Sequence, residues 1–126
     1  MSSLITSLFS LEILVPWILS MIFGIFVGAI PGLTATMAVA LLIPLTYYVD
    51  PRAAFAMILG VSFTSIFAGD IPATFLRIPG TPASGAAALD GFEMNKKGKG
   101  NLALAIDLLG SALGGLFGIL ILMFVA

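Results

Sequence analysis

The stretch RIPGTPASGAAALDG, residues 77–91, interrupts a chain that is otherwise apolar enough to form helices along its whole length. It places two prolines and a glycine within four consecutive positions, where a continuous helix would lose hydrogen bonds. A shorter stretch of the same kind, AIPGLTAT, occupies residues 29–36. The two Pro-Gly breaks therefore divide the chain into shorter helical segments.

The composition is that of a membrane protein. Of the 126 residues, 60% are hydrophobic and 9% are charged, and the mean hydropathy is +1.22. No charged residue occurs from Ile13 to Val49 or from Leu108 to Ala126. A helix of about 20 apolar residues crosses a hydrocarbon core of roughly 30 Å. We therefore expect an all-α membrane protein with about four or five helical segments, some of them Pro/Gly-broken or re-entrant half-helices.

The segment boundaries follow from the positions of charges, prolines and glycines. The long apolar segments are expected at Leu11–Ile30, Leu33–Val49, Ala53–Gly69 and about Leu102–Ala126, with the sequence DPR at residues 50–52 as a turn. The run from Gly69 to Ser84 contains three prolines, an aspartate and an arginine, which makes it too broken for a regular spanning helix. A short apolar helix, Pro82–Leu89, follows it and precedes the polar stretch at residues 90–101.

The lysines within residues 96–99 form the only basic cluster of the sequence, and the positive-inside rule places them on the cytoplasmic side. If Gly69–Leu89 is a re-entrant hairpin, Asp70 lies on that same side, and the DPR turn and the N-terminus lie opposite. If this stretch spans the bilayer, the order is reversed. The hairpin is favoured because Pro82–Leu89 is too short to cross. The aromatic residues expected as interfacial anchors are Trp17, Tyr47 and Tyr48.

Glycines recur every four residues in two trios, which puts each trio on one helix face. These are Gly24, Gly28 and Gly32, and Gly110, Gly114 and Gly118. Bare faces of this kind let two helix backbones approach closely, so helix packing is the favoured interpretation. The alternative for the first trio is that it lines a pathway, because it runs into the first Pro-Gly break.

Several functional classes are excluded by absent residues. The sequence contains no histidine and no cysteine, which removes thiolate catalysis, histidine acid–base catalysis and typical zinc ligation. It contains no glycine-rich phosphate loop. A net charge of −1 provides no field for nucleic acid or anionic lipid. We therefore expect no enzyme, no resident cofactor, no bound metal and no nucleic-acid partner.

Each break also restarts a helix. In the second break Thr81 stands where an N-cap belongs, Pro82 suits the first helical position, and Ser84 lies one turn in. In the first break Thr34 and Thr36 have the comparable places. A helix N-terminus carries free N–H donors and about half a positive charge, which favours an anion, and such ends are typical substrate sites in secondary transporters. The alternative is that both breaks are simple kinks.

Two stretches resemble a known family. GAIPGLTATMAVALLIPLTYYVDPRAAFAMILG, residues 28–60, and GDIPATFLRIPGTPASGAAALDGFEMNKKGKG, residues 69–100, are similar to the opening part of the large membrane subunit of the tripartite tricarboxylate transporters, the TctA family. The resemblance covers roughly residues 20–126. It implies a multi-pass protein of the bacterial inner membrane that works with a small membrane subunit and a periplasmic solute-binding protein and imports citrate or other carboxylates with cation coupling. Because family members are several times longer, residues 1–126 are expected to form a single transmembrane domain that is an incomplete N-terminal part of a larger transporter.

The breaks and the resemblance together predict a carboxylate site. The candidate substrate-binding residues are Pro31, Gly32, Thr34, Thr36, Pro79, Gly80, Thr81 and Ser84, in which glycines permit close approach and hydroxyls donate hydrogen bonds. Arg77 is a further candidate, because its guanidinium can bind a carboxylate with two hydrogen bonds. Its alternatives are an interfacial position and an ion pair with Asp70.

A tricarboxylate carries up to three negative charges, whereas two helix ends supply about one positive charge. Coupling to Na⁺ or H⁺ is therefore expected, with Asp70 and Asp107 as the candidate ion-coupling residues. Their alternatives are a loop or helix-end role for Asp70 and an interfacial position for Asp107. Two other functions stay open: a non-transporting fragment or assembly subunit, and a channel in which the breaks form a filter-like loop.

Overall fold

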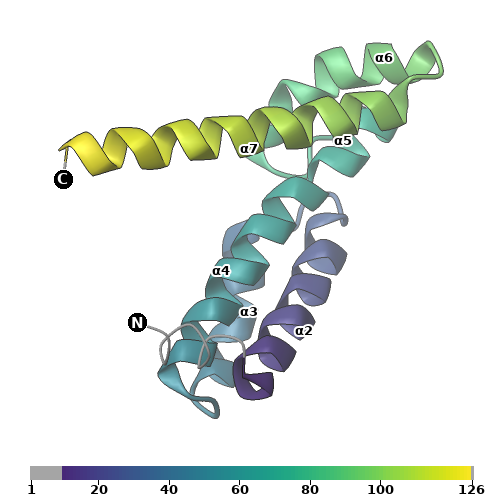
Figure 1. The fold of residues 1–126 in the computed structure, drawn as a ribbon. Coiled ribbons are helices and arrows are strands. Elements are labelled where there is room, and N and C mark those ends of the chain that lie inside the picture. Colours follow the sequence, from purple (N-terminus) through teal and green to yellow (C-terminus); the bar gives the residue numbers. More distant parts are fainter. Residues whose placement is uncertain (1–9, 126) are drawn as a thin grey trace.

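The computed structural model describes residues 10–125, and this part of the chain is helical and contains no strand (Figure 1). The elements are α2 (Leu11–Gly28), α3 (Ala35–Thr46), α4 (Pro51–Ala68), α5 (Asp70–Leu76), the 3₁₀ turn η1 (Pro82–Gly85), the π-helical turn η2 (Ala87–Gly91), α6 (Phe92–Lys96) and α7 (Gly100–Val125). The prediction of an all-α membrane protein is confirmed.

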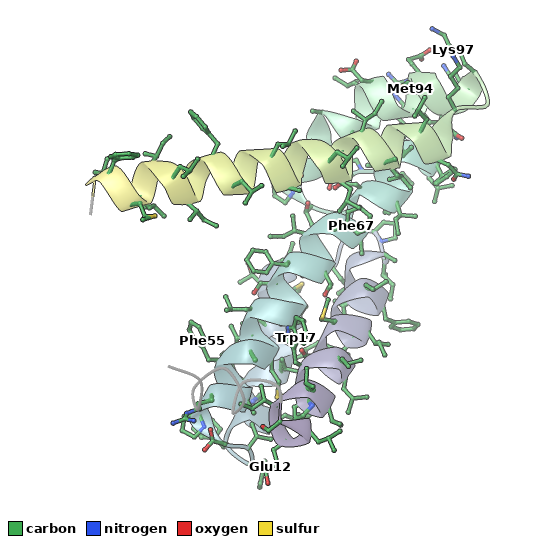
Figure 2. The ribbon with its side chains drawn as sticks, in the orientation of Figure 1. Glu12, Trp17, Phe55, Phe67, Met94 and Lys97 are labelled. Carbon is green, nitrogen blue, oxygen red and sulfur yellow. The ribbon has the colours of Figure 1, made fainter. Side chains whose placement is uncertain are left out.

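The helices form two groups. Helices α2, α3 and α4 pack side by side, whereas α5, η2, α6 and the first part of α7 form a second group at the far end of α4 (Figure 1). The side chains drawn in Figure 2 place Glu12 at the outer end of the first group and Lys97 at the outer end of the second. The remainder of α7 leaves the second group, and from Leu108 to Val125 every residue except Gly118 is exposed.

Among residues 10–125, three helices are long and apolar enough to cross a membrane. They are Leu11–Gly28, the combined α4 and α5 at Pro51–Leu76, and Gly100–Val125. Helix α3 has 12 residues, which is about 18 Å of helix and shorter than the expected segment Leu33–Val49. The difference arises at both ends, because the chain enters α3 only after Thr34 and leaves it at Tyr47.

Helices α2 and α4 approach closely through small residues. Ser20, Gly24 and Gly28 of α2 are buried against α4. A Cβ atom added to Gly24 would lie 2.8 Å from the carbonyl oxygen of Val61, and one added to Gly28 would lie 2.7 Å from Cα of Ser65. Packing is thus confirmed for Gly24 and Gly28. Gly32 differs from the prediction because α2 ends at Gly28, which leaves Gly32 outside the helix with φ of 93°.

Trp17 takes part in the same helix contact. Its indole lies over Gly60 of α4, where a Cβ would come within 2.9 Å of the ring, and 37% of Trp17 is exposed. The bare backbone of Gly60 offers the Trp17 ring a surface to pack against, and its interfacial position stays a prediction. Tyr47 and Tyr48 are 83% and 90% exposed at the end of α3, as an interfacial position requires.

The DPR turn is shorter than predicted. Asp50 alone stays outside the helix, where its carboxylate accepts a hydrogen bond of 2.9 Å from the backbone N–H of Arg52. Pro51 is the first residue of α4, a position that has no need of an N–H donor. Capping by Asp50 therefore starts α4 two residues before the expected Ala53.

The α4 helix also continues past its expected end at Gly69. Gly69 keeps helical dihedral angles, and α5 extends the span through Pro72 to Leu76. Pro72 is tolerated because it sits in the first turn of α5, where its missing N–H leaves no partner unsatisfied within that helix. In the run from Gly69 to Ser84 that was expected to be broken, the residues outside the helices and helical turns are therefore Gly69, at the α4–α5 junction, and residues 77–81.

The chain after α5 does not form the expected hairpin. It turns back at Arg77, which is left-handed with φ of 59°, and returns to Gly69 at Gly80. It then runs outward again along α5 through η1, η2 and α6, so Gly91 lies against Thr74. The helical stretch is longer than the expected Pro82–Leu89 and takes in most of the polar stretch after it, because each helical turn packs against α5.

We expect Gly24→Ala to lower the free energy of unfolding by about 1–3 kcal/mol, because the new methyl group meets the backbone of α4, which cannot move aside. Gly114→Ala is the matched control, since a Cβ there meets no atom within 4 Å and alanine favours the helix by about 1 kcal/mol. Chemical unfolding of the purified chain in detergent measures both. Equal stability of the two variants would contradict the α2–α4 contact.

Candidate functional site

The second Pro-Gly break meets the end of α2 and the α4–α5 junction at three glycines. Gly80 of the second break donates its N–H to the carbonyl oxygen of Gly69 over 3.3 Å, at the junction of α4 and α5. A Cβ on Gly80 would lie 2.7 Å from Cα of Gly69 and 3.1 Å from the carbonyl oxygen of Gly28, the last residue of α2. Side chains at these positions would force the three backbones apart. We refer to Gly28, Gly69 and Gly80 as the glycine junction.

Two buried hydroxyls adjoin the glycine junction. Thr81 is 5% exposed and Ser84 is fully buried, and their hydroxyl oxygens form a hydrogen bond of 2.8 Å. Thr81 takes the predicted N-cap position and Pro82 the first position after it, but the Thr81 hydroxyl makes no cap hydrogen bond. It pairs with Ser84 because η1 is a single 3₁₀ turn of four residues. The turn begins the helical stretch that continues through η2 and α6, so the hydroxyls and the free backbone N–H groups of this helix start are the polar groups here.

The first break is more open. Thr34 is confirmed as the cap of α3, since its hydroxyl accepts a hydrogen bond of 3.3 Å from the N–H of Met37. Pro31, Gly32 and Thr36 are exposed. Gly28, at the entrance to the first break, is the residue that reaches the second break, whereas a Cβ on Gly32 would meet nothing within 4 Å.

Of the candidate ion-coupling aspartates, Asp70 lies beside Ser84 of the hydroxyl pair, and Asp107 lies beside Asp70. Asp70 is the first residue of α5 and is 9% exposed. Its carboxyl group interacts with the side chains of Ser84 and of Asp107, which α7 supplies. The structure therefore brings together residues of α5, η1 and α7. The sequence identified each of them as a candidate but did not show that they lie close together.

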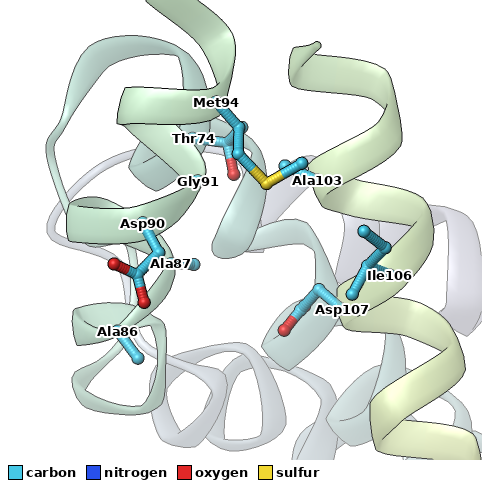
Figure 3. Close-up of a pocket in the computed structure, with 9 residues that line it drawn as sticks. All are labelled: Thr74, Ala86, Ala87, Asp90, Gly91, Met94, Ala103, Ile106 and Asp107. Atoms are coloured by element: carbon cyan, nitrogen blue, oxygen red, sulfur yellow. The ribbon is translucent and has the colours of Figure 1, made fainter.

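Cavities lie on either side of this pair of aspartates. Asp107 lines one of about 200 Å³, in which Asp90 of η2 and Asp107 of α7 stand on opposite sides (Figure 3). Thr74 and Met94 also line it. Asp70 lines another of about 250 Å³, together with Ser111 of α7 and apolar residues of α4.

Asp90 was missed from the sequence. The only feature of the sequence that indicated Asp90 was helical spacing, which places Ala86, Asp90 and Met94 on one face. The π-helical turn that brings Asp90 to the cavity cannot be predicted from the residue types. Among the described residues, no group of three or more acidic, histidine or cysteine side chains is arranged to hold a metal ion.

Arg77 lies apart from the hydroxyl pair. Its guanidinium carbon is 5.8 Å from the centre of the Phe92 ring, and the residue is exposed just beyond the end of the α4–α5 span. Within the described part of the chain no ion pair joins it to Asp70. This placement is the interfacial alternative left open by the sequence. Pro79 is also exposed, so Gly80, Thr81 and Ser84 are the buried members of the second break.

Comparison with known proteins gives one family. The model of the tripartite tricarboxylate transporter TctA family matches residues 14–126. A 52.8 kDa protein from Agrobacterium vitis, described as uncharacterised and located in the TAR-I ttuC' 3' region, is 33% identical over 99 residues. The match covers 79% of this chain and 20% of that protein, so the chain spans about a fifth of its relative. No solved structure matches the chain.

We expect Thr81→Val and Ser84→Ala each to destabilise the fold by about 1 kcal/mol or more, because each leaves a buried hydroxyl without its partner. Removing both should cost less than the sum of the single changes, by about 0.5–1.5 kcal/mol. Unfolding of the two single variants and the double variant in detergent gives this coupling. Thr46→Val, on an exposed hydroxyl, is the control. Additive effects would show that the two hydroxyls act independently.

Proposed function

The chain belongs to the tripartite tricarboxylate transporter TctA family, and we propose that it contributes to the membrane subunit of a secondary active, cation-coupled transporter for tricarboxylates or other carboxylates. The observation that carries the proposal is the burial of Thr81 and Ser84, in the second break, beside Asp70 of the Pro51–Leu76 span. Buried polar groups in a membrane segment are costly and are typical of substrate and ion pathways.

The substrate lies against the two breaks. Hydroxyls can donate to a carboxylate, and glycines let it approach the backbone closely. Thr81 and Ser84 supply the buried donors, while the exposed first break gives access from its open side. The proposed substrate-proximal residues are Pro31, Gly32, Thr34, Thr36, Pro79, Gly80, Thr81 and Ser84. Arg77 lies outside this set of residues, since its guanidinium lies over Phe92 at the end of the span.

Cation coupling follows from charge compensation. The glycine junction carries no positive side chain, and the nearest charged groups are the carboxyls of Asp70 and Asp107. A multiply charged carboxylate beside them requires Na⁺ or H⁺ to offset repulsion. Asp70 and Asp107 are the groups that bind this cation, and each of them lines a cavity.

The partners and location follow from the family. The transporter works with a small membrane subunit and a periplasmic solute-binding protein in the bacterial inner membrane. The turn at residues 96–99 faces the cytoplasm, and the start of α4 lies at the opposite end of the span. Transport, and not enzymatic catalysis, is its activity.

Uptake assays test the substrate site. In cells that express the chain with its partner subunits, Thr81→Ala combined with Ser84→Ala should weaken carboxylate affinity by about tenfold or more, the value of a lost hydrogen bond to a charged group. Thr46→Val should leave uptake unchanged, because its exposed hydroxyl bonds only to the carbonyl oxygen of Ile43. Unchanged affinity in the double variant would overturn the site. Passive conductance would indicate a channel, and silence with all partners present would indicate an assembly subunit.

The coupling residues are tested separately. Asp70→Asn and Asp107→Asn keep the side-chain shape but cannot become charged, so carboxylate uptake should lose its dependence on the imposed Na⁺ or H⁺ gradient. Glu12→Gln is the matched control, because Glu12 is an exposed carboxylate at the opposite end of the fold. Uptake is measured with and without each gradient. Full gradient dependence in both aspartate variants would contradict the assignment.

A further inference from the structure

The fold gathers basic residues at one end. Four of the five basic residues, Arg77, Lys96, Lys97 and Lys99, lie at the outer end of the second helix group, and the fifth, Arg52, lies at the start of α4. Of the acidic residues, only Asp90 and Glu93 belong to this end. The net charge of −1 for the whole chain therefore conceals a local excess of positive charge.

Phe92 holds two of these cations in place. The Nζ atom of Lys96 lies 4.9 Å from the centre of the Phe92 ring, and the guanidinium carbon of Arg77 lies 5.8 Å from it. Both distances are within the range of a cation–π interaction. Arg77 adopts a left-handed conformation with φ of 59°, the only positive φ of a non-glycine residue in residues 10–125. The backbone is therefore locally strained at Arg77, whose guanidinium lies over the Phe92 ring.

The turn at residues 96–99, called the lysine turn below, is held by backbone hydrogen bonds. The N–H groups of Lys97 and Lys99 both donate to the carbonyl oxygen of Met94, at 3.1 and 2.9 Å, and Gly98 donates to Asn95 at 2.8 Å. Gly98 has φ of 74°, which suits glycine at a helix end. Gly100 is buried against Phe75 and Asn95. The backbone that carries the lysines is therefore already ordered. A ligand that binds there causes little further loss of backbone entropy.

Glu93 only partly offsets the positive charge. It forms a salt bridge of 2.8 Å with Lys96, and this hydrogen bond lowers the pKa of Glu93, so the carboxylate stays ionised. It is the one salt bridge between the side chains of this end in the described residues. Arg77, Lys97 and Lys99 keep their charge available at the surface.

The cations stand directly beside apolar surface. Arg77 follows Leu76, the last residue of the α4–α5 span, and Lys99 precedes Gly100, the first residue of the α7 span. Leu76 and Ile78 are 61% and 48% exposed on either side of Arg77. A soluble anion would use only the cations, whereas a phospholipid would use both surfaces, with its phosphate at the cations and its acyl chains along the leucines and isoleucines.

We propose that Arg77, Lys96 and the lysine turn, arranged around Phe92, bind the headgroup of an anionic phospholipid at this end of the spans. The positive charge selects this ligand over a zwitterionic lipid, and the neighbouring apolar side chains select it over a soluble anion. The proposal does not rest on the transported substrate, because the proposed substrate site lies at the glycine junction, apart from these residues.

Native mass spectrometry of the full chain in neutral detergent tests this site. Dioleoylphosphatidylglycerol and dioleoylphosphatidylcholine serve as probes with identical acyl chains. The unaltered chain should retain the phosphatidylglycerol preferentially. Arg77→Asn with Lys96→Gln should weaken its retention by about fivefold for each removed charge. Asparagine is chosen because it tolerates the left-handed conformation. Arg52→Gln, at the opposite end, should leave retention unchanged.

Two results would overturn the site: equal phosphatidylglycerol retention by the unaltered chain and the double variant, and displacement of the lipid by free glycerol phosphate, which would mark a soluble-anion site. If the double variant does not fold, the salt dependence of the unaltered chain decides. Raised NaCl should release phosphatidylglycerol and leave phosphatidylcholine bound. Release that does not depend on salt would contradict a headgroup site.

Discussion

The contact between the backbones of Gly69 and Gly80 determines how the two helix groups join. A non-helical segment within a membrane span must satisfy its backbone groups internally, since an unpaired N–H or C=O in hydrocarbon costs several kcal/mol. The N–H of Gly80 meets this requirement by donating to the carbonyl oxygen of Gly69. The absence of side chains allows the approach. Because η1, η2 and α6 all start from this point, their places along α5 depend on it.

The same junction concentrates the polar groups of the span. Thr81 follows Gly80 directly, Ser84 lies one turn further on, and Asp70 follows Gly69, so the backbone contact brings two hydroxyls and a carboxyl group together. Asp107 joins them because α7 returns along α5 from the lysine turn. A site formed in this way can change when the helices move relative to one another, as alternating access requires. The proposed carboxylate site and the helix packing thus share the same few residues.

Charge is distributed along the fold in three levels. Glu12 and Asp50 lie at the outer end of the first helix group, Asp70 and Asp107 lie within the spans, and most basic residues lie at the outer end of the second group. The basic end has both a topological and a local consequence: it orients the chain by the positive-inside rule, and it provides fixed cations beside lipid-facing side chains. The acidic residues within the spans are the ones proposed for cation coupling.

Hydropathy and charge were enough to predict an all-α membrane protein, because any spanning segment must be long, apolar and internally hydrogen-bonded. The two breaks and the capping role of Thr34 could also be predicted, since proline, glycine and threonine act through local backbone chemistry. Contacts between segments that are distant in the sequence could not be predicted. That Trp17 faces Gly60, that Gly28 and not Gly32 reaches the second break, and that Asp90 faces Asp107 depend on which helix faces meet. Tertiary packing alone decides this, because many apolar faces of equal hydropathy could pack, and only shape and close backbone approach distinguish them.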